Sequence, residues 1–260
     1  MHADSAYVIG HGHKVCQDYA RHGRINGLDY AIVSDGCSSS PDTDIGARLL
    51  VLTTELNLQY CSEQGFTERA ILDISRHALY AAGFPPITLD PRCLDATLLM
   101  VVAWRDAISI LAGGDGVIAC LEQNDSVHIW DIEAPDNHPR YPNYLNDSAR
   151  RKIVESGQPW TVSGPGGVEM STPKVEAFYT AFTGQKVVAV FSDGVKSFVD
   201  ADRKPIPFEA IVRELLDFKY MTGQFVQRRM QKFLKAAAQR GWQHFDDLSM
   251  AAIYTGKEDD

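Results

Sequence analysis

Four strand-like segments follow one another with only short connections between them. They are apolar and rich in β-branched residues, and they cover Thr97–Trp104, Ile108–Ala112, Val117–Leu121 and Val127–Trp130. The connections are Arg105-Asp106, Gly113 to Gly116, and a turn at Asn124-Asp125. Connections of this length join antiparallel neighbours, because a parallel crossover needs a dozen or more residues. The sequence therefore predicts antiparallel β-sheet.

The remaining elements predict helices that come in pairs around runs of strands. Further strands are predicted at Tyr7–Gly10, Tyr30–Val33, Val187–Phe191 and Ser249–Tyr254, and helices at Asp44–Ser62, Thr67–Ala82, Pro207–Lys219 and Thr222–Arg240. In the first helix the predicted apolar side consists of Ile45, Leu49, Leu52, Leu56 and Tyr60. Paired helices and grouped strands indicate an α+β fold, with antiparallel sheet covered by helices.

The length and amino-acid composition limit which kinds of protein and partner are compatible with this chain. With 260 residues and 45% hydrophobic residues, we expect a single domain over residues 1–260. The formal net charge of -9 argues against a nucleic-acid partner. No apolar run reaches 18 residues and no signal peptide is recognisable, so we expect a cytoplasmic protein without membrane contact. The five cysteines include no Cys-x-x-Cys pair, which favours free thiols.

The stretch of residues 134–173 differs from the rest of the chain. It contains six prolines and one predicted helix, Asp147–Ser156. We interpret it as a flap-like excursion from the core. Such a segment carries substrate contacts in one interpretation and is a plain surface insertion in the other.

Four aspartates lie at the ends or starts of predicted strands. Asp35 and Asp193 each follow an apolar strand inside a Ser-Asp-Gly sequence, Asp246 precedes the last strand, and Asp18 lies in "CQDYA". Each alone is explained as a turn former. Together they predict an acidic cluster, which a hard divalent cation would neutralise. Oxygen-only ligands favour Mg²⁺ or Mn²⁺.

Six segments in this order resemble a known family. The segments "CQDYA", "YAIVSDGCSSS", "DATLLMVVAW", "ILAGGDGVIAC", "VVAVFSDGVKSF" and "FDDLSMAAIY" are similar to the signature segments of the metal-dependent protein phosphatases of type 2C (PPM family), especially the bacterial type. The resemblance extends from about Tyr7 to Tyr254. It implies a four-layer α-β-β-α sandwich of two antiparallel sheets flanked by helix pairs.

The resemblance also implies roles for individual residues. Asp35 corresponds to the aspartate that bridges two metal ions, and the Gly36 carbonyl would join the second ion. Asp193 and Asp246 resemble the remaining ligands of the first ion. Gln17 and Asp18 would hold metal-bound water, a role that a Glu-Asp pair has in many relatives.

The implied function is a Mn²⁺- or Mg²⁺-dependent serine/threonine protein phosphatase. It would hydrolyse phosphoserine and phosphothreonine with a water or hydroxide held by two ions, without a nucleophilic side chain. The implied partner is a phosphorylated protein, in signalling that opposes a serine/threonine kinase. Two alternatives stay open: a weak or inactive relative that acts as a regulatory binding module, and a phosphomonoesterase for small molecules.

The substrate-binding position departs from the family pattern. His13 stands where many relatives have an arginine that binds the substrate phosphate, with Lys14 as a possible helper. A histidine cannot form the bidentate fork of arginine, so weaker or more pH-dependent phosphate binding is expected. A competing interpretation makes His11 and His13 a metal-binding pair, although no third nitrogen or sulfur ligand is in register.

Three further positions concern the metal site. Ser197 occupies the place of an aspartate that often helps to bind a third metal in the family, which makes a third site doubtful. Asp95 replaces a typical glycine, and its carboxylate either lies near the metals or caps a strand. For Asp115, in "GGDG", a tight turn is the favoured interpretation over metal binding.

Overall fold

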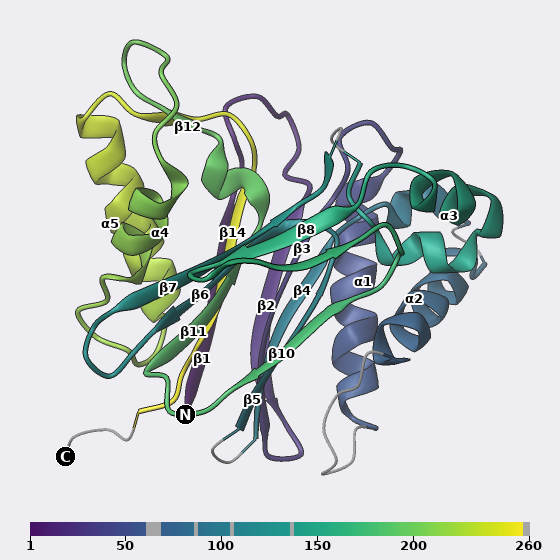
Figure 1. Cartoon of the computed structure of the whole chain (residues 1–260), viewed down its shortest axis with the longest axis horizontal. Helices are drawn as coiled ribbons and strands as arrows, with labels where there is room; N and C mark the ends of the chain where they lie inside the picture. Colours follow the sequence, from purple (N-terminus) through teal and green to yellow (C-terminus); the bar gives the residue numbers. More distant parts are fainter. Residues whose placement is uncertain (61–68, 86–87, 105–106, 136–137, 257–260) are drawn as a thin grey trace.

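The computed structural model describes residues 1–60, 69–85, 88–104, 107–135 and 138–256, and two antiparallel sheets form its centre (Figure 1). The first sheet has the order β1 (His2–Val8), β14 (Leu248–Tyr254), β11 (Val187–Phe191), β6 (Gly116–Leu121), β7 (Val127–Glu133), β8 (Trp160–Gly164) and β9 (Gly167–Thr172). The second has the order β10 (Phe178–Phe182), β5 (Ala107–Gly113), β4 (Leu98–Trp104), β3 (Leu28–Asp35) and β2 (Asp18–Ile25). A small ladder joins β12 (Phe198–Val199) to β13 (Gln243–His244).

Helices cover the outer face of each sheet. Figure 1 shows α1 (Thr43–Leu58) and α2 (Arg69–Ala82) on one side, and α4 (Phe208–Leu216) and α5 (Phe225–Gln239) on the other. A shorter helix, α3 (Ser148–Glu155), and the 3₁₀ turns η1 (Pro91–Leu94), η3 (Pro142–Asn146) and η4 (Asp193–Lys196) lie in the connections. The predicted α+β sandwich with four layers is confirmed.

Three apolar clusters hold the layers together. One packs α1 and α2 on the five-stranded sheet, another packs α4 and α5 on the seven-stranded sheet, and the third lies between the sheets. Strands β3 and β11 are buried along nearly their whole length, because they lie inside the sheets with both faces covered. Continuous apolar runs such as "VVAVF" fit this double burial.

The apolar side predicted for the first helix is wrong. Ile45 is 41% exposed, Leu56 54% and Tyr60 86%. The buried side of α1 instead carries Ala47, Leu50, Val51, Thr54 and Leu58. Gly46 of α1 decides this orientation, because any side chain there would clash with η1: a Cβ on Gly46 would lie 1.7 Å from the carbonyl oxygen of Cys93. Only this face allows α1 to approach η1 so closely.

The stretch of residues 134–173 is only partly an excursion. Its helix is present as α3, where the Asp147 side chain accepts hydrogen bonds from the backbone N–H groups of Ala149 and Arg150. Its second half contains β8 and β9, which extend the seven-stranded sheet, so this half stays with the core. Trp160 and Val162 of β8 are buried between the sheets, which stabilises this extension.

The other predicted elements lie within a few residues of the observed ones, except that the strand predicted at Tyr7–Gly10 is β1 at His2–Val8, and β10 is not predicted. Strand β2 was not predicted, since its arginines and histidine hide the alternation of buried and exposed residues. The predicted turn at residues 105–106 and the predicted helix termini within residues 61–68 lie outside the described residues. Within the described residues, no helix is long and apolar enough to span a membrane.

Candidate active site

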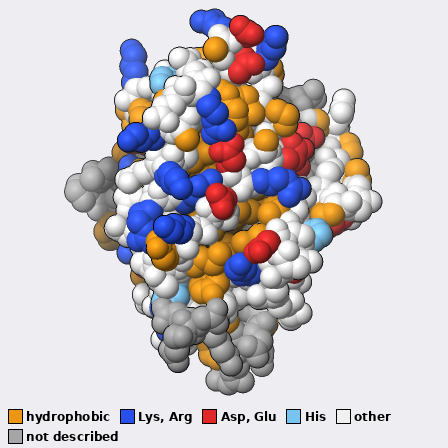
Figure 2. All heavy atoms as spheres, turned by 90° about the vertical axis from the view of Figure 1, so that its left-hand side faces the viewer, with side chains coloured by type: hydrophobic (Ala, Val, Ile, Leu, Met, Phe, Trp, Pro, Cys, Tyr) orange, Lys and Arg blue, Asp and Glu red, His pale blue; other side chains and the backbone are white. Residues whose placement is uncertain are grey.

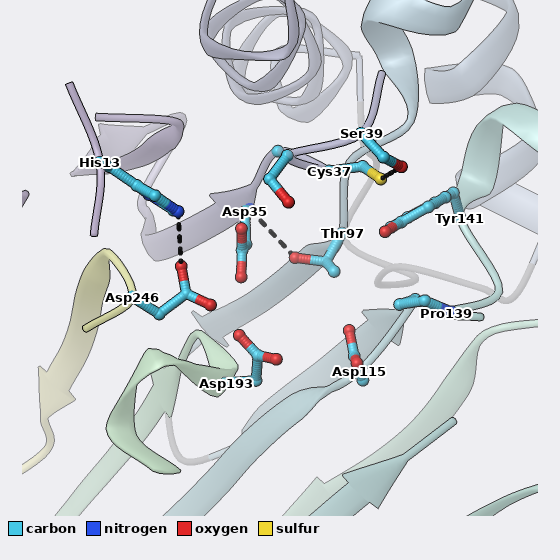
Figure 3. A pocket seen from close by; sticks show the side chains of 12 residues that line it. His13, Asp35, Cys37, Ser39, Thr97, Asp115, Pro139, Tyr141, Asp193 and Asp246 are labelled. Carbon is cyan, nitrogen blue, oxygen red and sulfur yellow. Dashed lines mark hydrogen bonds and ion pairs between the residues drawn. The ribbon is translucent and has the colours of Figure 1, made fainter. Parts of the chain in front are cut away.

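A polar pocket of about 160 Å³ lies where several strands of both sheets end. Figure 3 shows four aspartates around it, Asp35, Asp115, Asp193 and Asp246, together with His13. The rest of the lining consists of Gly36, Cys37, Ser38, Ser39, Thr97, Pro139 and Tyr141. No lysine or arginine is among these lining residues, so the carboxylates lack a permanent positive charge beside them in the pocket.

Strand register brings these aspartates to one end of the sandwich. Asp35 ends β3 opposite Asp18, the first residue of β2. Asp193 follows β11 at the start of η4, and Asp246 precedes β14, the strand that pairs with β11. The two Ser-Asp-Gly sequences thus deliver carboxylates from the two different sheets to the same pocket.

The backbone around Asp35 is fixed by the neighbouring strand. The Asp35 N–H donates to Thr97 Oγ1 at 3.0 Å, and Gly36 forms a β-bridge with Ala96. A Cβ on Gly36 would lie 2.8 Å from Thr43, so only glycine allows the chain to turn here. Gly36 therefore lines the pocket with its backbone, as a carbonyl ligand requires.

Asp18 lies behind the pocket and does not line it. The residue is 1% exposed, and its Oδ2 accepts a hydrogen bond of 2.7 Å from Ser192 Oγ. Its other oxygen, Oδ1, is buried without a hydrogen-bond partner among the described residues. A buried carboxylate oxygen of this kind is an available acceptor for an ordered water.

Gln17 points away from the pocket. Its Nε2 donates to Thr43 Oγ1 of α1 at 2.6 Å, and its backbone N–H donates to Asp247 Oδ2 at 2.6 Å. The structure thus places the side chain between β2 and α1, outside the pocket lining. This arrangement suits a residue that fixes the loop before β2.

His13 faces carboxylates with both ring nitrogens. Its Nε2 lies 3.6 Å from Asp246 Oδ1, and its Nδ1 lies 3.0 Å from Asp247 Oδ2 (Figure 3 shows the first contact). Burial lowers the pKa of His13, but the hydrogen bond and charge of Asp247 and the charges of Asp246 and Asp18 outweigh it and raise this pKa above its ordinary value. Lys14 is exposed and does not line the pocket.

Asp247 is a site residue that sequence reasoning missed. It is 1% exposed and accepts hydrogen bonds from the backbone N–H groups of Gly10 and Gln17. Through these bonds and its contact with His13 it holds the loop of residues 9–17 against the start of β14. The doublet Asp246-Asp247 was the only sequence signal for it.

Burial and mutual repulsion raise the pKa values of several carboxyls. Burial raises the pKa of Asp35 well above its usual range, and the charges of Asp18, Asp193 and Asp246 add to this effect. Burial also raises the pKa of Asp18 to about 7 and, with the charge of Asp193, that of Asp115 to about 7. The pocket therefore favours any partner that supplies positive charge.

The donor set fits divalent metal ions with oxygen ligands. Four carboxylates converge on one small pocket, and the lining lacks lysine and arginine. Among the described residues, no three His, Cys, Asp or Glu side chains already form a tight ligand cluster. Carboxylate and carbonyl oxygens are the ligands that Mg²⁺ and Mn²⁺ take in proteins.

Asp115 lies in the pocket although sequence reasoning favoured a plain turn. It does sit in the turn between β5 and β6, between Gly114 and Gly116 with φ of 98° and 143°. Figure 3 nevertheless shows its carboxylate on the same side of the pocket as that of Asp193. The turn dipeptide pattern could not show this, because turn propensity carries no information on where the side chain points.

Ser197 is engaged in local hydrogen bonds. Its Oγ donates to the Gly194 carbonyl at 2.8 Å and accepts from the Asp246 N–H at 3.2 Å. It does not line the pocket. It fixes the backbone of Asp246 relative to η4.

Asp95 anchors the segment that follows β7 to the pocket loop. It is 1% exposed and forms a bidentate pair with Arg150 of α3, at 3.0 and 2.7 Å. It also accepts hydrogen bonds from Asn143 Nδ2 at 3.0 Å and from Ser40 Oγ at 2.8 Å. Asp95 is thus neither a pocket residue nor a simple strand cap.

Tyr141, within the anchored segment, closes one side of the pocket. It is 6% exposed and hydrogen-bonds with the thiol of Cys37. Burial raises the pKa of Cys37, but hydrogen bonds from Ser39 and Tyr141 outweigh burial and lower it overall. Of the five cysteines, the four that the structure describes are all free thiols, as expected.

Comparison with known proteins now identifies the family. A family model described as Protein phosphatase 2C matches residues 10–235. The chain belongs to the protein phosphatase 2C family. A comparison with curated protein sequences finds no match.

Solved structures share the fold of this phosphatase 2C chain. A bacterial serine phosphatase is 10% identical with a TM-score of 0.59, and all of both chains is covered. Serine/threonine phosphatase Stp1 from Staphylococcus aureus is 11% identical with a TM-score of 0.62, over 98% of this chain and 95% of that one. PppA, a regulatory component of the type VI secretion system in Pseudomonas aeruginosa, is 16% identical with a TM-score of 0.53, over 97% of each chain.

Proposed function

We propose that this chain is a serine/threonine protein phosphatase that depends on Mn²⁺ or Mg²⁺. The observation that carries the proposal is the pocket itself, in which four carboxylates from both sheets face a polar cavity without lysine or arginine in its lining. Membership of the phosphatase 2C family supports hydrolysis of a phosphoester. The substrate would be a phosphorylated protein, and the reaction would oppose a serine/threonine kinase in a cytoplasmic signalling pathway.

The residues that would hold two cations are Asp35, the Gly36 carbonyl, Asp193 and Asp246, with Asp115 as an additional carboxylate of the same pocket. When bound, the cations would lower the pKa of a water molecule and neutralise charge on the phosphoryl oxygens. No side chain is then needed as a nucleophile. We therefore expect product release without a phosphoenzyme.

The chain's own groups would prepare the site in three ways. Asp18, with its free Oδ1 behind the pocket, would order water beside Asp35. His13 would orient Asp246, since its ring lies between Asp246 and Asp247. Phosphate binding by His13, expected from the sequence, stays a separate prediction, because both of its nitrogens face carboxylates here.

The segment around Tyr141 would contact the substrate beside the phosphate. Tyr141 and Pro139 form the wall opposite His13 in Figure 3. A buried tyrosine and a proline offer a rigid surface for the residues next to phosphoserine or phosphothreonine. We expect these two residues to influence peptide substrates more than small phosphoesters.

The test is hydrolysis of a phosphothreonine peptide and of p-nitrophenyl phosphate, each with Mn²⁺, with Mg²⁺ and with excess chelator. The proposal expects turnover of both substrates only with added metal, and a higher kcat/KM for the peptide. Full activity in chelator would contradict the metal-dependent mechanism. Turnover of neither substrate would favour a regulatory binding module, and turnover of the small ester alone would favour a phosphomonoesterase.

A further inference from the structure

A groove on the face covered by α4 and α5 shares no lining residue with the aspartate pocket. It consists of two adjoining hollows of about 170 and 570 Å³. Both are lined by Asp217 and Phe218, which directly follow α4, so the two hollows meet at these residues. We call it the α4–α5 groove.

The α4–α5 groove is positively charged although the chain is acidic. Its cations are Lys186, Arg213, Lys219, Arg228, Arg229 and Lys232, and its carboxylates are Asp125 and Asp217. The whole chain has a net charge of -9. Figure 2 shows Lys and Arg side chains gathered around hydrophobic side chains on this face. Six cations beside two carboxylates give a local potential opposite to that of the molecule.

Most of these cations are not neutralised. Lys186 pairs with Asp125 at 2.8 Å, and Arg229 approaches Asp217 at 3.5 Å. The other four cations have no carboxylate partner within the part of the chain that the structure describes; these are Arg213, Lys219, Arg228 and Lys232. Cations around a hollow that lack a carboxylate partner are available to an anionic ligand.

Backbone carbonyls hold two of the guanidinium groups in place. Arg228 Nη2 donates to the Thr222 carbonyl at 2.6 Å. Arg229 Nε donates to the Glu214 carbonyl, and the Arg229 side chain is only 10% exposed. Side chains anchored in this way lose less conformational entropy when a ligand binds.

The floor of the groove is apolar. Phe218 packs edge-to-face on Phe225 with ring centroids 5.0 Å apart, and Leu216 and Leu121 are buried beneath it. Tyr220 is 63% exposed at the rim. The groove thus combines an apolar floor with a cationic border, which matches an amphipathic ligand.

We propose that the α4–α5 groove docks an acidic segment of a partner protein that carries Asp and Glu residues around a Leu or Phe anchor. The carboxylates would contact Arg213, Lys219, Arg228 and Lys232, while the apolar side chain would cover Phe218. Charge complementarity would orient the partner and speed its association. A nucleic acid fits less well, because its phosphates would leave the apolar floor uncovered and the remaining surface is acidic. This inference does not depend on the proposed function, since it uses none of the aspartate-pocket residues.

The test measures binding of a fluorescently labelled 12-residue peptide with nine Glu or Asp residues and three interspersed Leu or Phe residues. Fluorescence anisotropy with the full chain should show saturable binding that weakens with salt. The double variant Arg213→Glu/Lys232→Glu should bind at least about tenfold more weakly, since two attractive charges become repulsive. A peptide with Ser in place of the apolar residues should also bind more weakly.

Lys152→Glu provides the matched control. Lys152 is an exposed lysine on α3, a helix whose residues do not line the groove, so this charge reversal should leave peptide affinity within about twofold. Circular dichroism and p-nitrophenyl phosphate hydrolysis should be unchanged in both variants, which shows intact folding independently of docking. Equal weakening by Lys152→Glu, absence of peptide binding at low salt, or tighter binding of an oligonucleotide, an anionic vesicle or a second copy of the chain would overturn the proposal.

Discussion

The ion pair between Asp95 and Arg150 offers the sharpest test of how the pocket wall is held. The substitution is Arg150→Met. In the present structure the guanidinium carbon of Arg150 lies 4.5 Å from the centroid of the Tyr144 ring. Methionine keeps much of the apolar stem over this ring but removes the charge. Asp95 then stays buried with hydrogen bonds only from Ser40 and Asn143 among its present side-chain partners. The segment that follows β7 and carries Pro139 and Tyr141 then loses its ion pair with Asp95.

The expected loss in the free energy of unfolding depends on how deeply Asp95 and Arg150 are each buried. Removing one partner of a fully buried ion pair costs about 3–5 kcal/mol. The Arg150 side chain is 30% exposed, whereas that of Asp95 is 2% exposed, so solvent screens part of the interaction. The two remaining hydrogen bonds of Asp95 reduce the cost further, and we expect a loss of about 2 kcal/mol. For a chain of this size that loss lowers Tm by roughly 4–8 °C.

The assay compares thermal and urea unfolding with kinetics on two substrates. We expect kcat/KM for a phosphothreonine peptide to fall about tenfold, equivalent to about 1.4 kcal/mol of transition-state stabilisation, because Tyr141 and Pro139 lose their fixed position. Hydrolysis of p-nitrophenyl phosphate should fall by less than about threefold, since the aspartates do not move.

Arg151→Met is the matched control on the same helix. Arg151 pairs with Glu155 at 2.9 Å in an i,i+4 pair whose side chains are 42% and 25% exposed, and pairs of this kind on helices stabilise by only about 0.3–0.5 kcal/mol. Equal loss of stability in Arg150→Met and Arg151→Met would refute the anchoring role of Asp95. Equal loss of activity on both substrates in Arg150→Met would refute the link from the anchor to peptide recognition.

Three further predictions concern the aspartate pocket. Asp193→Asn should lower phosphopeptide turnover at least roughly 100-fold with the fold intact, because mutating even residues that only support metal ligands lowers activity about 10–100-fold. Near-native rates would show that Asp193 only shapes an ordinary turn. In chelator, the free energy of unfolding should fall as pH rises from about 4 to about 7, because pKa values of about 7 for Asp18 and Asp115 make the folded chain bind more protons than the unfolded chain. Urea titrations at several pH values check this, and a flat profile would contradict it. His13→Ala should raise the Mn²⁺ concentration needed for half-maximal rate more than it raises KM; the opposite pattern would support phosphate binding by His13.

Much of the fold could be predicted because its signals are local. The strands from Leu98 to Glu133 follow from apolar, β-branched runs and short turns, and the strand predicted at Val187–Phe191 has the bounds of β11. The face of α1 could not be predicted in this way. Its orientation depends on the close approach of Gly46 to Cys93, a tertiary contact that outweighs hydrophobic content.

The candidate site was predictable in its strand-end aspartates and less so in its supporting residues. Asp35, Asp193 and Asp246 could be found because a carboxylate after a buried strand is visible in the sequence. Asp115 and Asp247 could not, since a turn dipeptide does not show whether its carboxylate faces a cavity, and an acidic doublet does not show which of its members is buried behind one. Their positions depend on how the two sheets come together.

The aspartate pocket and the α4–α5 groove carry opposite charges and therefore favour different ligands. In the aspartate pocket, like charges are held together by the strand register, and their raised pKa values show that folding alone does not satisfy them. In the α4–α5 groove, unpaired cations border an apolar floor formed by Phe218. Each region carries an excess of one charge, with six cations beside two carboxylates in the groove and four carboxylates beside His13 in the pocket, so each is a place where binding of the opposite charge lowers the free energy of the folded chain. If a metal ion satisfies the first and an acidic protein segment the second, as proposed above, we expect separate mutations to alter catalysis and partner binding.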